Sequence, residues 1–129
     1  MKRVIAVLFT VSTLTMSLYG YDQTDRIKDM QSMETAMSEI QKGILYNNKK
    51  MVLQGVENLK KASASVEVAP KGHMDYNAVF AKKQAKNIMK YSEKIKTNIE
   101  AGRKHGAATN YTKVLGECIS CHNKIRKWN

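Results

Sequence analysis

Apolar residues that recur every three or four positions organise most of this chain. In residues 24–46 this spacing places one apolar face on an α-helix. That face holds Ile27, Met30, Met33, Met37, Ile40 and Ile44. Residues 49–64, 75–101 and 107–127 show the same spacing. The 129 residues include one proline and 7 glycines, and Lys, Glu, Ala, Met and Gln are common, which favours helix over strand.

The connections between these stretches predict how the helices are arranged. Asn47-Asn48 predicts a short turn, and residues 62–77, which contain Pro70, predict a longer loop. Residues 102–106, bounded by two glycines, predict a break before the last helix. Amphipathic helices joined in this way favour an all-α, up-down-up-down four-helix bundle.

The first 20 residues predict a signal peptide rather than part of the fold. Lys2 and Arg3 precede an apolar run, 4–18, that ends at a small residue, Gly20, as in secretory signal peptides. We therefore expect one domain, residues 21–129, in the periplasm, with no integral membrane segment. A retained membrane anchor is the alternative, although the run is short for a span of about 20 residues.

The chain is strongly basic, with a formal net charge of +11. Without Lys2 and Arg3 the mature chain keeps about +9. Export argues against nucleic acid as a partner. Lysines spread along helical faces are usually a solvated surface, but they can also steer a protein towards an acidic partner or an anionic membrane. The charge does not choose between these two.

The most specific motif lies near the C-terminus. Cys118 and Cys121, the only cysteines, are followed directly by His122, which gives the C-x-x-C-H signature of c-type haem attachment. On a helix, residues three apart lie on one face, so both thiols can add across the two vinyl groups of one porphyrin. The histidine then supplies the proximal ligand of the iron. The apolar face of this last stretch holds Tyr111, Leu115, Cys118, His122 and Ile125.

Three other interpretations of the cysteines are weaker. A disulfide across so short a loop would restrict little of the unfolded chain. A thioredoxin-like dithiol normally opens a helix after a strand, whereas this pair lies deep in the last predicted helix. A zinc site needs a second pair of ligands, and His73 and His105 are too isolated in the sequence to form one.

A helical chain with this motif near the end of its last helix resembles the class II cytochromes c, which include the cytochromes c prime and their methionine-ligated relatives. The resemblance covers residues 21–128 and is carried by Tyr111, Leu115, Cys118, Cys121, His122 and Arg126. It implies one covalent haem c, bound near the end of the last helix of a four-helix bundle. Some members dimerise through their first two helices, so a homodimer would fit the family.

The sixth ligand of the iron divides this family. In cytochromes c prime an apolar side chain blocks that position, whereas in the relatives a methionine of the first helix binds the iron. The start of the first helix lies beside the end of the fourth in such a bundle, so Met30 and Met33 are better placed than Met37. The resemblance, anchored on Arg26, favours Met30. Methionine at helical spacing is, however, also a common core residue.

Arginines are predicted near the same end of the bundle. Arg26 and Arg126 could pair with the haem propionates, because guanidinium groups bind carboxylates well. Exposure to solvent is the alternative for Arg26. Trp128 could pack on the edge of the macrocycle or only cap the bundle.

Two functions from different classes follow from the motif. The first is electron transfer, in which a periplasmic monohaem cytochrome carries single electrons between redox partner proteins. The second is binding of nitric oxide or carbon monoxide at an open, five-coordinate iron, which requires that no methionine ligates it. Enzyme activity is not expected, because Asp29 and Glu34 read as surface carboxylates rather than as a distal acid–base pair.

Overall fold

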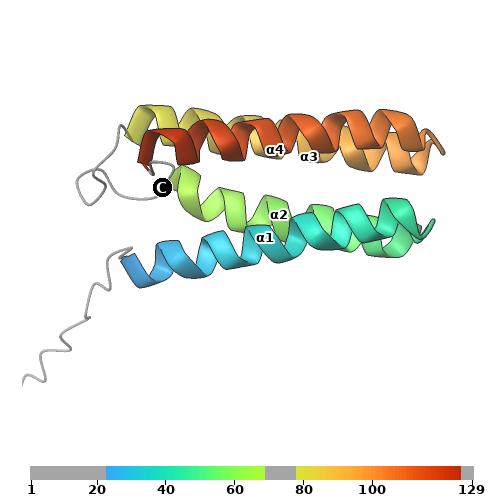
Figure 1. The fold of residues 1–129 in the computed structure, drawn as a ribbon, viewed down its shortest axis with the longest axis horizontal. Coiled ribbons are helices and arrows are strands. Elements are labelled where there is room, and N and C mark those ends of the chain that lie inside the picture. Colours follow the sequence, from blue (N-terminus) through green and yellow to red (C-terminus); the bar gives the residue numbers. More distant parts are fainter. Residues whose placement is uncertain (1–22, 69–77, 126–129) are drawn as a thin grey trace, which may run out of the picture.

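Four α-helices packed against each other make up the part of the chain that the computed structural model describes, residues 23–68 and 78–125 (Figure 1). They are α1 (Gln23–Leu45), α2 (Lys49–Val68), α3 (Ala78–Glu100) and α4 (Lys104–Ile125). These residues form no β-strand, so the prediction of an all-α, four-helix fold is confirmed. None of the four helices combines the length and the apolar character needed to cross a membrane.

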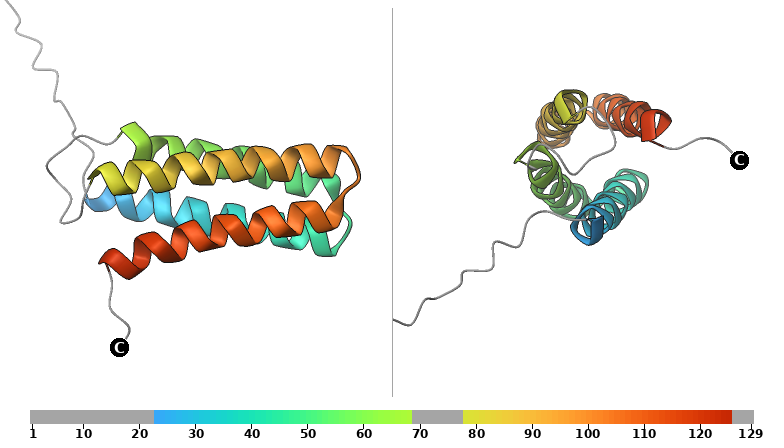
Figure 2. Two further views of the ribbon diagram at one scale, coloured as in Figure 1. Left: turned by 90° about the horizontal axis from the view of Figure 1, so that it is seen from above. Right: turned by 90° about the vertical axis from the view of Figure 1, so that its left-hand side faces the viewer.

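Each helix contacts two neighbours. Helix α1 packs on α2, α2 on α3, α3 on α4, and α4 contacts α1 along the sparsest of the four seams. The start of α1 and the end of α4 lie at one end of the molecule, and the α1–α2 and α3–α4 turns lie at the other (Figure 1). Towards its C-terminal end, α4 diverges from the other helices (Figure 2, left).

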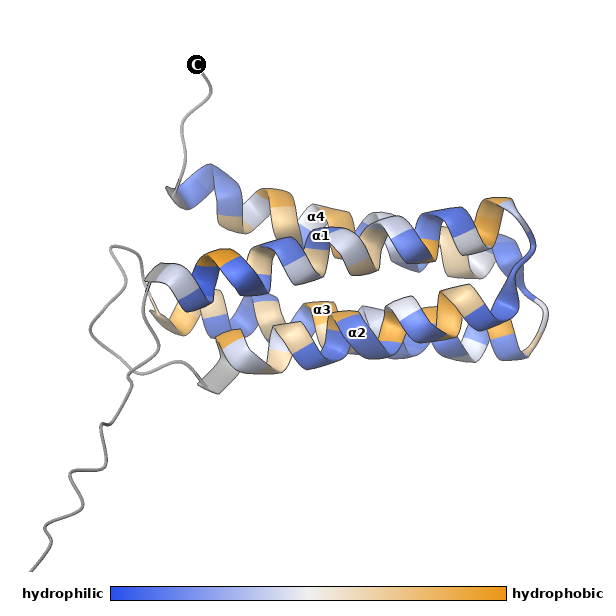
Figure 3. Ribbon diagram, turned by 90° about the horizontal axis from the view of Figure 1, so that it is seen from below, coloured by the Kyte–Doolittle hydropathy of each residue, from blue (hydrophilic) through white to orange (hydrophobic). Residues whose placement is uncertain are grey.

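The core lies along the inner faces of the helices. Apolar and polar residues alternate in short bands along each of them (Figure 3), as amphipathic helices require. The largest fully buried side chains are Ile40, Leu59 and Ile95, all at positions that the spacing predicts. Burial of one such side chain contributes roughly 1.5–3 kcal/mol, so these positions dominate the stability of the bundle.

The turn between α1 and α2 is set by two asparagines. Asn47 has a left-handed backbone, with φ of 56°, and the N–H of Asn48 donates to the carbonyl of Gly43 at 2.8 Å. This return bond is the Schellman arrangement that ends a helix. The Asn48 side chain then caps α2, because its Oδ1 accepts the N–H of Met51 at 3.0 Å. The predicted short turn is thus confirmed.

The turn between α3 and α4 repeats this chemistry with a glycine. Gly102 has φ of 72°, which costs a glycine little because it lacks a Cβ. The N–H of Arg103 donates to the carbonyl of Asn98 at 2.8 Å, and that of Gly102 donates to Ile99 at 3.1 Å. Both bonds of the Schellman motif are therefore present, and α4 begins directly afterwards.

A glycine allows α1 and α2 to approach closely. A Cβ added at Gly55 would lie 2.9 Å from both the carbonyl oxygen of Ala36 and Cγ1 of Ile40. No side chain fits at that separation without moving one helix. The α1–α2 seam is therefore closer there than any larger residue would allow.

Two predicted boundaries are wrong. Helix α2 runs to Val68 instead of ending near residue 64, because Ala62 and Val66 are buried and prolong its apolar face. The Ser63 hydroxyl, which reads as a loop signal, donates to the Leu59 carbonyl at 2.8 Å inside the helix. The break predicted at residues 102–106 is shorter, since Lys104 already begins α4.

Candidate functional site

The C-x-x-C-H motif lies near the C-terminal end of α4. Cys118 and Cys121 are free, half-buried thiols, and their spacing places them on one face of the helix. Cys118 packs against the margin of the core. His122 is exposed, since one residue further along a helix turns the side chain by about 100°. The motif thus combines two sheltered thiols with an accessible imidazole.

The surroundings of the thiols keep them protonated. Burial, and after it the neighbouring Cys121, raise the pKa of the Cys118 thiol to about 11. Burial also raises the pKa of the Cys121 thiol. A redox-active dithiol needs the opposite, a nucleophilic thiol whose pKa is lowered. The site therefore disfavours the thioredoxin-like interpretation.

The described residues offer the motif no further ligands for a zinc site. His105 lies in the first turn of α4, about 20 Å along the helix from Cys118 at 1.5 Å per residue. In residues 23–68 and 78–125, no three His, Cys, Asp or Glu side chains gather where they could hold a metal ion. Within this part of the chain, no further side chain therefore joins Cys118, Cys121 and His122 as a metal ligand.

Contacts with α3 hold α4 in place on both sides of the motif. Asn87 Nδ2 donates to Glu117 Oε2 at 3.2 Å, and Glu117 directly precedes Cys118. Beyond the motif, Lys124 Nζ lies 5.2 Å from the centroid of the Phe80 ring. These two contacts join α4 to α3 directly before and shortly after the motif.

The first helix brings methionines to the same end of the molecule. The N-terminal turns of α1 lie at the end that carries the motif (Figure 1). Met33 and Met37 are buried core residues, with 7% and 8% of their surface exposed. Met30 is half-buried and packs at the margin of the core. Of these three methionines, Met30 is the one least committed to packing.

Arg26, in the first turns of α1, has an unsatisfied donor. Its Nε is buried and has no hydrogen-bond partner among the described residues. A buried donor without a partner costs roughly 1–3 kcal/mol, and more when it is charged. A carboxylate at this place would satisfy it, because guanidinium–carboxylate hydrogen bonds are among the strongest in proteins.

Large apolar side chains near the motif are left uncovered. Ile27 is 48% exposed, Leu115 43% and Ile119 49%. The spacing predicts a core position for Ile27, and this prediction is wrong in the described structure. Leu115 lies on the face of the last helix that the sequence assigns to Cys118 and His122. The physical reason is that α1 and α4 contact each other sparsely, so few neighbours are available to cover them.

These residues fit the chemistry of a c-type haem. The macrocycle is apolar, and uncovered apolar side chains lie near the motif. It carries two vinyl groups, for which Cys118 and Cys121 provide two free thiols. It also carries carboxylates, for which the buried Arg26 Nε offers a donor that has no partner among the described residues. His122 is the nitrogen ligand that the motif supplies.

The inner face of α4 differs from the predicted one. Ala107, Asn110 and Val114 are buried there, whereas His122 is exposed. Asn110 donates to the Gly106 carbonyl at 2.8 Å, but its Oδ1 has no partner among the described residues. The sequence does not single out Asn110, because an asparagine on a helix normally reads as a surface residue.

Several predicted positions lie outside the described residues. They include the signal peptide, His73, Arg126 and Trp128. The role of Arg126 as a partner of the haem propionates therefore stays a prediction. So does the alternative that Trp128 packs against the macrocycle.

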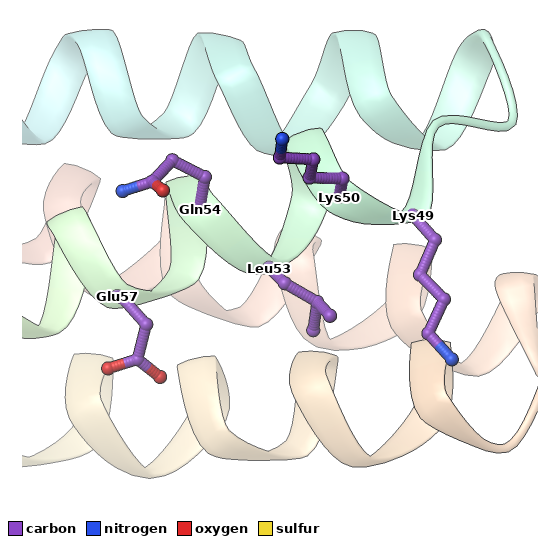
Figure 4. Close-up of a pocket in the computed structure, with 5 residues that line it drawn as sticks. All are labelled: Lys49, Lys50, Leu53, Gln54 and Glu57. Atoms are coloured by element: carbon purple, nitrogen blue, oxygen red, sulfur yellow. The ribbon is translucent and has the colours of Figure 1, made fainter.

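Two surface hollows lie away from the motif. One, on α2 near the α1–α2 turn, is lined by Lys49, Lys50, Leu53, Gln54 and Glu57 (Figure 4). The other lies between α1 and α2 and includes Ser32, Thr35 and Asn58 in its lining. No residue of the C-x-x-C-H motif lines either hollow, so neither contributes to the candidate site.

No family model, curated protein or solved structure matches this chain in comparisons with known proteins. The resemblance to the class II cytochromes c therefore rests on residues of the chain itself. Its most specific part is the C-x-x-C-H motif at Cys118, Cys121 and His122. The rest is the helical pattern.

Proposed function

We propose that this chain is a periplasmic monohaem c-type cytochrome that carries single electrons between redox partner proteins. The observation that carries the proposal is the C-x-x-C-H motif, with two free thiols sheltered on one face of α4 and a histidine beside them. The fold that belongs to the proposal is an up-down-up-down bundle of the class II type, with the haem near the end of its last helix.

In this proposal each residue of the motif has a separate task. Cys118 and Cys121 would hold the haem covalently, each through a thioether to one of its vinyl groups. His122 would supply a ring nitrogen as the ligand of the iron. When bound, haem supplies a one-electron ferric–ferrous couple. Cys118 and Cys121 are both half-buried in the protein, which supports their role as the attachment points.

Met30 is the proposed distal ligand. Its half-buried place at the margin of the core supports this choice, because Met33 and Met37 are held within the core. A thioether is a soft donor, and a methionine ligand alongside histidine would raise the reduction potential of the iron. This suits a carrier that accepts an electron and passes it on.

The two arginines are proposed to hold the propionates. Arg26 contributes the buried Nε that lacks a partner among the described residues, and Arg126 is assigned by resemblance alone. A charged hydrogen bond to a carboxylate would satisfy the Arg26 donor and would tie the start of α1 to the cofactor.

Covalent attachment is the test of this proposal. The protein is purified from a host that attaches haem c, denatured in acid and extracted with organic solvent. We expect the haem to stay on the polypeptide, and single Cys118→Ser and Cys121→Ser variants to retain one thioether each. His122→Ala should impair attachment and remove the proximal ligand, which the absorption spectrum of the haem that remains reports. Release of all haem from the wild-type protein would contradict the proposal.

A further inference from the structure

The end of the bundle opposite the C-x-x-C-H motif carries exposed basic and apolar side chains together. Both short turns lie there (Figure 1), and the Lys104 ammonium donates a hydrogen bond to Asn47 Oδ1 that joins one turn to the other. We call this surface the turn face. It consists of Lys42, Leu45, Tyr46, Lys49, Lys50, Arg103 and Lys104, all of them exposed.

The turn face itself contains no carboxylate. Residues 41–50 and 101–110 contain five Lys or Arg and no Asp or Glu. The flanking carboxylates in sequence are Glu39 and Glu100, and Glu57 lines the hollow beside Lys49 and Lys50. None of the five cations forms an ion pair within the described residues. In the middle of the bundle, by contrast, Lys60 pairs with Glu93 at 2.8 Å. The turn face therefore presents its positive charge to whatever lies beyond it.

Two adjacent apolar side chains project from the same surface. Leu45 is 67% exposed and Tyr46 is 72% exposed. The backbone that carries them is ordered, since the Tyr46 N–H donates to the Lys42 carbonyl at 2.8 Å. Tyrosine prefers the interface between water and lipid headgroups, because its ring is apolar and its hydroxyl polar. An exposed Leu-Tyr pair flanked by lysines thus has the chemistry of an interfacial anchor.

We infer that the turn face is a docking surface for an anionic lipid bilayer. The five cations approach the phosphate groups of the lipid headgroups, and Leu45 and Tyr46 enter the boundary of the acyl chains. The turn face lies at one end of the bundle, and its lysine side chains are long. Such side chains can adapt to mobile lipid headgroups more easily than to a rigid groove in a protein. The net charge, which is +11 for the full chain and about +9 without residues 1–20, adds long-range attraction to an anionic membrane.

This docking would orient the molecule. Lys104 begins α4, and Cys118 lies about 20 Å further along the helix at 1.5 Å per residue. A bilayer at the turn face therefore leaves the C-x-x-C-H end directed away from the membrane. The inference does not depend on haem, because no residue of the motif contributes to the turn face.

Vesicle co-sedimentation tests the inference with the purified protein in the form that cells accumulate. Vesicles of phosphatidylcholine with about a third phosphatidylglycerol are compared with pure phosphatidylcholine. We expect binding to the anionic vesicles only, and loss of most of it when salt rises from about 0.05 M to about 0.5 M. All variants share the same N-terminal segment, so a difference between them does not arise there.

Two double variants of the turn face separate its contributions. Lys49→Gln with Lys50→Gln should weaken binding by about 30-fold at low salt, which is about fivefold per lysine. Leu45→Ser with Tyr46→Ser should weaken it by about tenfold while the dependence on salt remains. All four side chains are exposed, so we expect the variants to keep the fold. Circular dichroism checks this.

A control at the other end of the bundle decides whether location matters. Lys28→Gln with Lys83→Gln removes the same charge from exposed positions near the starts of α1 and α3, and it should change binding by less than about threefold. An equal loss in this control would overturn the inference in favour of diffuse charge. So would absence of binding to anionic vesicles. Binding to immobilised polyglutamate but not to vesicles, weakened by the turn-face variants, would overturn it in favour of an acidic protein partner.

Discussion

At the scale of single residues, the burial of Cys118 predicts how the chain responds to alkaline pH before haem is attached. Its thiol pKa is raised from 9.0 to about 11, so the unfolded chain loses this proton first. The contribution of this thiol to the free energy of unfolding is therefore fully present below about pH 9. It falls as the pH rises, by about 2–3 kcal/mol at pH 11. Urea unfolding of reduced, haem-free protein at several pH values measures this loss.

The matched control for this titration is Cys118→Ala. Lysines and tyrosines titrate in the same range, but they do so in both proteins, so the difference between the two curves isolates the thiol. We expect the variant to lose less stability than the wild type above about pH 9. Parallel curves would mean that the Cys118 thiol is not sheltered in the haem-free protein.

The identity of the sixth ligand is also a residue-scale question. If Met30 binds the iron, the reduced wild-type protein is low-spin and takes up carbon monoxide slowly or weakly. Met30→Ala should open the position, give a high-spin spectrum and let the gas bind readily. The absorption spectrum with and without carbon monoxide measures both changes.

The neighbouring methionines provide the controls. Met37 is a core residue, so Met37→Ala should cost about 2–5 kcal/mol of stability with little spectral change. If Met33→Ala alone opens the site, the ligand is one turn further along α1. A wild-type protein that is already high-spin and binds carbon monoxide at once would instead favour the five-coordinate, gas-binding function.

Single residues differ in how far the sequence alone could predict them. The C-x-x-C-H spacing marks Cys118, Cys121 and His122 because the chemistry of attachment requires that order. The buried, unsatisfied Nε of Arg26 depends on how α1 packs with its surroundings, which no local pattern encodes. The burial of Asn110 has the same origin.

At the scale of helices, one crowded glycine and one uncrowded glycine give a matched pair of substitutions. Gly55→Ala should destabilise the fold by about 1–3 kcal/mol, because the added Cβ meets the Ala36 carbonyl oxygen at 2.9 Å. Gly116→Ala should stabilise it by up to about 1 kcal/mol, since nothing lies within 4 Å of the added Cβ and alanine favours helix. Chemical denaturation of both variants measures these changes.

This prediction would be contradicted if both substitutions changed the stability in the same direction. If both variants gain stability, α1 and α2 are farther apart at Gly55 than the structure has them. If both lose stability, Gly116 is in contact with something beyond the described residues. The Gly55 result thus reports on the contact between α1 and α2, and the Gly116 result reports on the surroundings of α4.

Helices were easier to predict than their ends. Periodic apolar residues locate all four because each helix needs one buried face. The sequence does not predict the end of α2, because Ser63 and Ser65 look like loop residues, although a serine hydroxyl can donate back to a carbonyl of its own helix. Nor does it predict the inner face of α4, because that face depends on how α4 packs against its neighbours.

At the scale of the whole molecule, the sequence predicts that residues 1–20 are removed. Mass spectrometry of protein from the periplasm should find an N-terminus near Tyr21, and the loss of Lys2 and Arg3 should leave a net charge of about +9. The intact segment in a membrane fraction would support the retained anchor instead.

The sparse α1–α4 seam has a consequence for the order of folding. The other three seams join helices that follow one another in sequence, so each brings together segments of small sequence separation and forms early. The fourth seam joins the two ends of the described chain, so it should form last and reopen at the smallest free-energy cost. The motif on α4 would then be reachable for enzymatic modification while the rest of the bundle is already assembled.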